Sequence, residues 1–146
     1  MANPIYTAKA TVTGGRAAGH GRTSDGLLDV QLRLPKEMDP NASEAGTNPE
    51  QLFAVGWAAC FEGALGVVGR REHVELGEVS IDSSVSLSPN GSGGFQLSAE
   101  LAVSLPDVTD AEKAKQIVAA AHQVCPYSNA TRGNIDVVLT ANGETV

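Results

Sequence analysis

Basic residues and cysteines are scarce in this sequence, and each shortage narrows what the protein can be. Ten lysines and arginines stand against 17 aspartates and glutamates, giving a formal net charge of -7. A surface of that sign repels phosphates, so neither nucleic acid nor an anionic membrane is expected as a partner. The first residues lack a charged segment followed by an apolar one, so we expect no secretory signal and a cytoplasmic protein. In that reducing compartment, Cys60 and Cys125 are not expected to form a lasting structural disulfide.

Motifs for phosphate and metal binding are also missing. The glycine-rich segment Gly14–Arg22 lacks the spacing of a phosphate-binding loop or a dinucleotide fingerprint, and no helical pattern follows it. We expect a turn or loop there. The three histidines, His20, His73 and His122, have no ligand-like spacing with one another or with the cysteines, so no metal site is predicted.

The most informative stretch that is present is Thr47–Phe61, with the sequence TNPEQLFAVGWAACF. It predicts the start of a long helix running from Pro49 to about Arg71. Asn48 suits the N-cap position, and Thr47 with Glu50 offers an alternative capping box.

This predicted helix is apolar on all sides, which is typical of a core, a subunit interface or a membrane. Glu62 and three glycines, Gly56, Gly63 and Gly66, argue against a membrane span. We expect the glycines to mark close approach by another element. A helix of this kind near a subunit interface predicts a dimer.

The remaining pattern predicts an α+β fold in one domain, residues 1–146. Strands are expected at Ile5–Thr13, Leu27–Leu34, Val79–Ser88, Phe95–Leu105 and Ile135–Thr140. The third and fourth of these form a hairpin, and a loop over Pro35–Thr47 precedes the long helix. The order is ββαββαβ, with mainly antiparallel sheets and helices on one face.

A second helix is predicted between the hairpin and the last strand. Thr109 is its expected cap, with Glu112 completing a capping box. Its apolar face ends at Cys125, and Pro126 favours a break just before it.

Cys60, Cys125, Arg16 and Glu50 are the residues that could together form a reactive site. A cysteine reacts as its thiolate, so a reactive Cys60 needs a nearby cation, and Arg16 is the preferred candidate. The Glu50 carboxylate could hold the guanidinium in a two-pronged pair. Simpler interpretations stay open: two inert buried cysteines, a solvated loop arginine and a first-turn helix acid.

Spacing limits how these residues can meet. Glu50 and Cys60 are ten residues apart, about 15 Å along a continuous helix. A shared site therefore needs a bridging Arg16, a break in the helix, or a second subunit. We expect a partner subunit to supply Arg16 and Glu50 to Cys60.

Two long motifs resemble the organic hydroperoxide resistance (Ohr) family of the OsmC/Ohr superfamily. They are Thr47–Phe61 and Val124–Val137, the latter reading VCPYSNATRGNIDV. Thr11–Arg16 and Ser24–Val30 resemble the N-terminal part of the same family, so the resemblance covers nearly the whole chain.

The resemblance implies an intertwined homodimer with an OsmC/Ohr-like fold and thiol peroxidase activity toward organic hydroperoxides, including those of fatty acids. It implies that Cys60 is the peroxidatic cysteine, that Cys125 resolves it, and that Arg16 and Glu50 activate the thiolate. The implied reductant is dihydrolipoamide on a lipoylated protein, itself serviced by a flavoprotein reductase. No bound metal or organic cofactor is expected.

Phe53, Trp57 and Phe61 are interpreted as core residues, some of which could also wall an apolar substrate pocket. Two other functions remain open. One is an OsmC-type peroxidase of broader specificity. The other is a redox-sensing or apolar-ligand-binding dimer without turnover.

Overall fold

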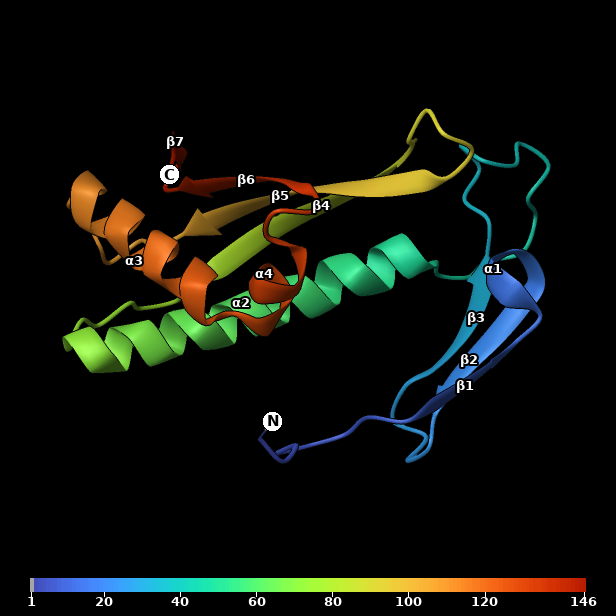
Figure 1. Ribbon diagram of the computed structural model, residues 1–146, viewed down its shortest axis with the longest axis horizontal. Helices are drawn as coiled ribbons and strands as arrows, with labels where there is room; N and C mark the ends of the chain where they lie inside the picture. Colours follow the sequence, from blue (N-terminus) through green and yellow to red (C-terminus); the bar gives the residue numbers. More distant parts are fainter. Residues whose placement is uncertain (1) are drawn as a thin grey trace. The chain divides into compact units, whose positions relative to one another are not determined.

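The fold is taken from a computed structural model, which describes residues 2–146. The chain forms two compact units, one ending at Leu52 and the other beginning at Phe53. This division falls inside a long helix, α2 (Pro49–Glu72). Figure 1 labels the elements of both units. The single domain expected from the length stays a prediction.

The first unit contains an antiparallel sheet in the order β1-β2-β3. Its elements before α2 are β1 (Ala10–Thr13), α1 (Gly15–Ala18), β2 (Gly19–Thr23) and β3 (Asp29–Arg33). In the sheet, Gly21 of β2 lies between Val12 and Val30. The predicted strand Leu27–Leu34 is confirmed, although the observed strand β3 is shorter.

The prediction of a loop over Gly14–Arg22 is wrong, because this segment forms α1 and most of β2. Gly14 turns the chain between β1 and α1 with a φ of 76°, a left-handed conformation that disfavours a side chain. At Gly19, an added Cβ would lie 1.9 Å from the carbonyl oxygen of Gly15. These glycines therefore permit close packing in a defined structure.

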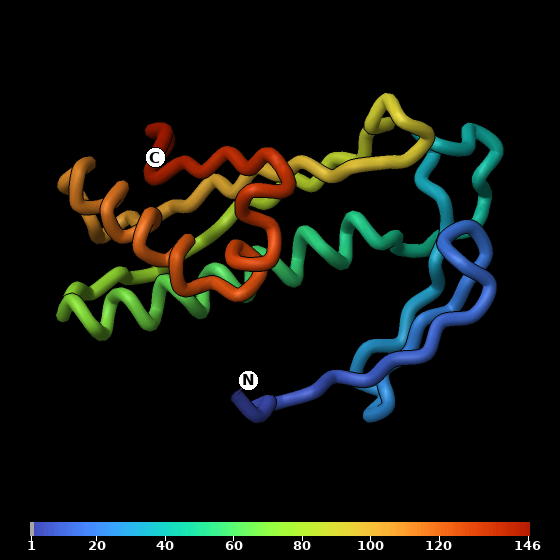
Figure 2. Tube along the Cα trace, in the orientation of Figure 1, coloured from blue at the N-terminus to red at the C-terminus, as the bar shows by residue number. Residues whose placement is uncertain are grey.

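The predicted strand Ile5–Thr13 is too long, since β1 begins at Ala10. Ala10 lies opposite Thr23, where β2 ends, so the preceding residues have no further part of β2 to pair with. Ile5 and Tyr6 are exposed. After β3, the trace in Figure 2 runs through turns before α2, which confirms the predicted loop Pro35–Thr47.

The second unit adds a mixed sheet in the order β4-β5-β6-β7, with β6 parallel to β5 and the other neighbours antiparallel. Its elements after α2 are β4 (Ser80–Pro89), β5 (Phe95–Ser104), α3 (Ala111–Val124), α4 (Pro126–Thr131), β6 (Asp136–Ala141) and β7 (Glu144–Thr145). The predicted hairpin and the α+β class are confirmed. The predicted order ββαββαβ was incomplete, because it omitted α1, β2, α4 and β7.

Helix α2 begins as the sequence predicts. The Asn48 side chain accepts a hydrogen bond from the backbone N–H of Gln51 at 2.9 Å, which makes it the N-cap. The Thr47 hydroxyl instead bonds the Gln51 side chain at 2.7 Å. The alternative capping box with Glu50 is therefore wrong.

Helix α3 has a different cap from the predicted one. Asp110 is the N-cap, and its carboxylate accepts bonds from the backbone N–H groups of Glu112 and Lys113. The prediction of Thr109 is wrong by one residue. The predicted break at Pro126 is confirmed, but the chain resumes a helix at once, since proline fits the first position of α4.

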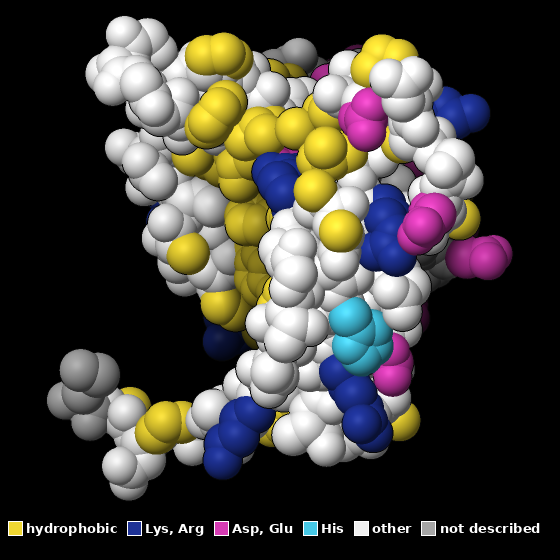
Figure 3. Space-filling model, turned by 90° about the vertical axis from the view of Figure 1, so that its right-hand side faces the viewer, with side chains coloured by type: hydrophobic (Ala, Val, Ile, Leu, Met, Phe, Trp, Pro, Cys, Tyr) yellow, Lys and Arg dark blue, Asp and Glu magenta, His cyan; other side chains and the backbone are white. Residues whose placement is uncertain are grey.

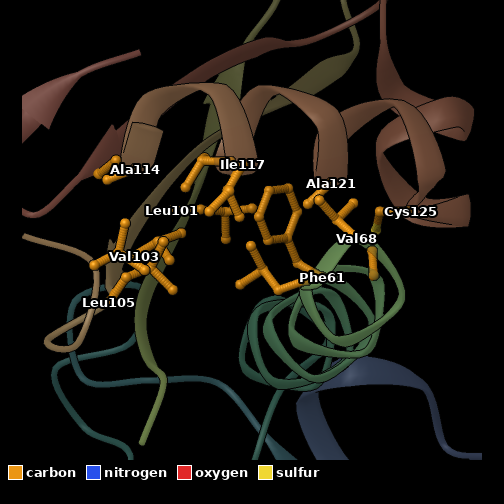
Figure 4. Close-up of a cluster of buried hydrophobic side chains, with 14 of the residues drawn as sticks. Phe61, Val68, Leu101, Val103, Leu105, Ala114, Ile117, Ala121 and Cys125 are labelled. Atoms are coloured by element: carbon orange, nitrogen blue, oxygen red, sulfur yellow. The ribbon is translucent and has the colours of Figure 1, made fainter. Parts of the chain in front are cut away.

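The core of the second unit lies between the sheet and the helices α2 and α3. Figure 4 shows Phe61 of α2 pointing toward Ile117 and Ala121 of α3 and toward Leu101 of β5. Among the described residues, α2 is the helix that is long and apolar enough to cross a membrane by length and composition. Because Trp57, Phe61 and Leu65 have no exposed surface, α2 is a core helix of this unit.

The outer side of α2 is less covered. Val55 is 71% exposed, and a Cβ added at Gly63 would meet no described atom within 4 Å. The prediction that glycines mark close approach is confirmed at Gly56, where an added Cβ would lie 3.1 Å from the Tyr127 hydroxyl. Within the described chain it fails at Gly63.

Candidate functional site

Cys60 and Cys125 come from different elements of the second unit and differ in exposure. Cys60 lies in the middle of α2 and is half-buried, whereas Cys125 is fully buried. Cys125 ends α3 and starts α4: its N–H donates to the carbonyl of Ala121, and its own carbonyl accepts from the N–H of Asn129. Both cysteines are free thiols. One thiol is thus reachable from solvent and the other is enclosed.

The two thiols interact directly. Burial raises the pKa of Cys60, the backbone N–H of Tyr127 lowers that pKa, and the neighbouring Cys125 thiol raises it further. The net pKa of Cys60 is raised. Within residues 53–146, no cation is among the groups that shift it. The second unit by itself therefore disfavours the reactive thiolate of Cys60.

Arg16 and Glu50 form an ion pair in the first unit. Arg16 is in α1 and Glu50 in the first turn of α2, and Arg16 Nη2 donates to Glu50 Oε2. The predicted pairing is confirmed, with one guanidinium nitrogen making the contact in place of two. The side chains are 33% and 18% exposed, so water screens the pair only in part. Arg16 Nε is buried without a partner among the described residues.

Helix α2 is continuous from Pro49 to Glu72, which excludes a helix break between Glu50 and Cys60. Ten residues of unbroken helix separate these two by about 15 Å along the axis. Glu50 and Cys60 of one α2 helix therefore do not touch. Two of the three ways for Arg16, Glu50 and Cys60 to share one site therefore stay open: a bridging Arg16 or a second subunit.

Aromatic side chains cluster between α2 and α4, the helices next to the two cysteines. Trp57 and Phe61 have no exposed surface, so the structure places them in the core. Phe53 is half-buried and packs edge-on against Trp57 at 5.6 Å and against Tyr127 at 5.8 Å between ring centroids. Tyr127 is 38% exposed, so Phe53 and Tyr127 are the rings of this cluster that keep some exposed surface.

Tyr127 and Ser128 are site residues that the sequence analysis missed. Tyr127 supplies a backbone N–H to Cys60. Ser128 has no exposed surface, and its hydroxyl accepts a hydrogen bond from Trp57 Nε1 at 3.3 Å. Both lie in the motif that follows Cys125. Their position within three residues of a cysteine is the feature of the sequence that could have indicated them.

A cleft lies apart from the cysteines, and no metal site is found among the described residues. A cleft of about 580 Å³ near the end of α2 is lined by Glu62, Arg70 and His73, among others, and neither cysteine lines it. Within residues 2–146, no group of three or more His, Cys, Asp and Glu side chains is arranged to hold a metal ion.

A family model for OsmC-like proteins matches residues 40–140. An organic hydroperoxide resistance protein of Xanthomonas axonopodis pv. citri is 53% identical over 144 residues, covering 96% of this chain and 99% of the relative. OhrB of Bacillus subtilis, also an organic hydroperoxide resistance protein, is 48% identical over 136 residues, covering 92% of this chain and 96% of its own.

Solved structures agree with these relatives. A crystal structure of a putative organic hydroperoxide resistance protein from Vibrio cholerae, with captopril in one of its active sites, has a TM-score of 0.91 at 48% identity, covering 99% of this chain and 96% of that one. The crystal structure of Bacillus subtilis OhrB has a TM-score of 0.84 at 47% identity, covering 93% of this chain and 98% of that one. The chain therefore belongs to the OsmC-like family and, within it, to the organic hydroperoxide resistance proteins.

Proposed function

We propose that this protein is a thiol peroxidase that reduces organic hydroperoxides to alcohols. The observation that carries the proposal is the pair of interacting free thiols, with Cys60 half-buried and Cys125 enclosed. A reachable thiol can meet a peroxide, and an enclosed thiol beside it is protected from direct oxidation. The names of the relatives support the substrate class.

In the first step, the Cys60 thiolate attacks an oxygen of the hydroperoxide. An S–O bond forms and the O–O bond breaks, leaving a sulfenic acid on Cys60. The alkoxide that leaves takes up a proton and departs as an alcohol. Cys60 is oxidised by two electrons and the peroxide is reduced by two.

In the second step, the Cys125 thiol attacks the Cys60 sulfenic sulfur. An S–S bond forms and water leaves, which competes with further oxidation of Cys60 by more peroxide. An external dithiol then reduces the disulfide through two exchange reactions and is itself oxidised to a disulfide. We propose dihydrolipoamide, carried on a lipoylated protein and renewed by its flavoprotein reductase, as this dithiol. No bound metal or organic cofactor takes part.

The activation of Cys60 requires a cation, and we propose that it is Arg16 of a second subunit in a homodimer. Two observations support this: no cation of the second unit shifts the pKa of Cys60, and the continuous α2 keeps Glu50 away from Cys60 of the same helix. Arg16 is already oriented by Glu50. A guanidinium beside the thiol would offset the burial that raises the pKa of Cys60.

The rings near Cys60 support a preference for bulky organic peroxides. Phe53 and Tyr127 give an alkyl or aryl group apolar contact, while Trp57 and Phe61 support them from the core. Hydrogen peroxide gains nothing from such contact. A specificity constant for cumene hydroperoxide that only equals that for hydrogen peroxide would contradict the preference and favour an OsmC-type enzyme of broader range. We place the activity in the cytoplasm, where thiols stay reduced.

Steady-state reduction of cumene hydroperoxide by dihydrolipoamide tests the proposal in three proteins: wild type, Cys60→Ser and Cys125→Ser. We expect turnover in wild type, no reaction in Cys60→Ser, and consumption of about one peroxide per chain in Cys125→Ser before inactivation. A wild type that forms the disulfide once but does not turn over with any dithiol would contradict the enzyme and leave a redox sensor.

A further inference from the structure

The indole of Trp57 and the hydroxyl of Ser128 form a hydrogen bond in the core that takes no part in the proposed reaction steps. The donor is Trp57 Nε1 and the acceptor is Ser128 Oγ, 3.3 Å away. The bond joins α2 to α4, and both side chains are completely buried. A buried indole N–H needs such a partner, since water cannot reach it.

Both ends of this bond lie one helical turn from a cysteine. Trp57 is three residues before Cys60 on α2, so the two side chains lie on adjacent turns of one face. Ser128 is three residues after Cys125 and stands in the short helix that Cys125 starts. The bond therefore connects the backbone that carries one thiol with the backbone that carries the other.

The helices that carry the two thiols differ in length and continuity. Cys60 is fixed within a 24-residue helix. Cys125 lies at the corner between α3 and α4, where Pro126 interrupts the helical hydrogen bonds, and α4 is only six residues long. A disulfide forms only when the two Cβ atoms are about 3.5–4.5 Å apart with a suitable dihedral angle. A small shift of α4 along α2 would take Cys125 out of that range.

We propose that Ser128 is a positioning residue, which holds α4 against Trp57 and so keeps the Cys125 thiol within bonding reach of Cys60. The proposal rests on the proposed function in treating Cys60 and Cys125 as the redox pair. It adds that disulfide formation, and not the attack on peroxide, depends on the Trp57–Ser128 bond. Ser128 touches neither substrate nor the reacting sulfurs in this role.

The first test measures how readily the two thiols pair, without any peroxide. Reduced protein is equilibrated with mixtures of glutathione and its disulfide, and the fraction of Cys60–Cys125 disulfide is read by mass spectrometry. One glutathione disulfide oxidises the thiol pair and yields two glutathione thiols. We expect Ser128→Ala to lower the equilibrium constant for pairing about tenfold, because a displaced Cys125 loses part of the effective concentration that favours the internal disulfide.

Ser83→Ala is the matched control. The Ser83 hydroxyl is also buried but has no hydrogen-bond partner among the described residues, so its removal should leave the thiol pairing unchanged. Ser128→Thr keeps the accepting hydroxyl and adds a methyl group, and it should pair its thiols as wild type does even where its stability falls. A Ser128→Ala equilibrium equal to that of wild type overturns the proposal. If Ser128→Ala does not fold, a folded Ser128→Thr with lost pairing overturns it equally.

The second test uses a pulse of cumene hydroperoxide. Ser128→Ala should consume the first peroxide at the wild-type rate but divert about tenfold more Cys60 to the sulfinic acid, because condensation with Cys125 is slower. Slowing of both steps alike would reveal a general structural defect and contradict a positioning role. A wild type inert to peroxide would defeat the proposed function, whereas the glutathione equilibrium would still decide the role of Ser128.

Discussion

Cys60 and Cys125 carry the same functional group, and their surroundings give them different chemistry. Burial raises the pKa of Cys60, although the backbone N–H of Tyr127 opposes that effect. Cys125 is sealed in the core, where only a group from inside the protein reaches it. The half-buried thiol therefore suits attack on a substrate, and the enclosed thiol suits a later internal step.

Replacing Arg16 tests the source of Cys60 activation. We expect Arg16→Gln to raise the kinetic pKa of the reaction with peroxide by about one unit or more, since a guanidinium beside an anion stabilises it by that order. The wild type should then reach its maximal rate at a lower pH than the variant. Stopped-flow rates between pH 5 and pH 10 would show the shift.

Arg22→Gln is the control for this experiment, because Arg22 is an exposed arginine of β2 paired with Asp29. Figure 3 shows basic side chains beside acidic ones on one face of the molecule. The Arg22–Asp29 and His20–Asp29 pairs are exposed contacts of this kind. Removal of such a surface charge should leave the pH profile in place. Equal shifts in the two variants would point to overall charge and not to Arg16.

His122 predicts a dependence of stability on pH. Burial lowers the pKa of its imidazole, and the positive charge of Arg132 lowers it further. The unfolded chain binds a proton near pH 6.5, whereas the folded chain binds it only at lower pH. Stability is therefore complete above about pH 6.5 and falls as the pH drops toward the lowered pKa.

Urea unfolding at pH 7.5 and pH 5.5 would measure this effect. We expect His122→Asn to lose less stability between the two pH values than wild type does. His73→Asn is the control, since it removes a histidine from the exposed turn after α2, where asparagine tolerates the positive φ. A pH dependence identical in wild type and His122→Asn would contradict the assignment.

At the scale of helices and strands, the cap of α3 offers a sharp comparison. Asp110→Ala removes the acceptor for two backbone N–H groups and should cost about 1 kcal/mol of the free energy of unfolding. Thr109→Ala, one residue earlier, should change it by less than about 0.5 kcal/mol. Denaturant unfolding of both variants measures the difference, and a larger loss in Thr109→Ala would reverse the assignment of the cap.

Sequence periodicity predicted the elements whose residues repeat regularly. The long apolar run and the Asn48 cap gave α2, and alternation around a glycine-rich turn gave the β4–β5 hairpin. Helix α1 and strand β2 were not predicted, because their glycines permit close packing and produce no periodic pattern in the sequence. Helix α4 was not predicted, because Pro126 marks the end of one helix and is also the first residue of the next.

The site was predicted in a similarly uneven way. The Arg16–Glu50 pair joins residues 34 positions apart, and it was reached through residue chemistry and the family resemblance. Tyr127 and Ser128 were missed because their approach to α2 depends on the packing of an unpredicted helix. No pattern along the chain encodes such a tertiary contact.

At the scale of the whole molecule, the chain offers reasons to associate with a second copy. The outer side of α2 exposes Val55 and leaves Gly63 open, although a helix of this composition is normally covered. Cys60 also lacks a cation from its own unit, while Arg16 and Glu50 form a prepared pair in the other unit. A twofold dimer that exchanges these groups would cover the exposed side of α2 and bring Arg16 to Cys60. It would contain two equivalent sites.

A mixed dimer tests the central claim, that Cys60 reduces peroxide with the help of Arg16 from a second subunit. Arg16→Gln and Cys60→Ser chains are co-expressed with different tags, and the dimer carrying both tags is purified. One of its two sites combines an intact Cys60 with an intact Arg16, so we predict about half of the wild-type cumene hydroperoxide turnover with dihydrolipoamide. Each variant alone should be far less active. A mixed dimer with no activity beyond that of its parents would contradict the account and place Arg16 and Cys60 of each site in the same chain.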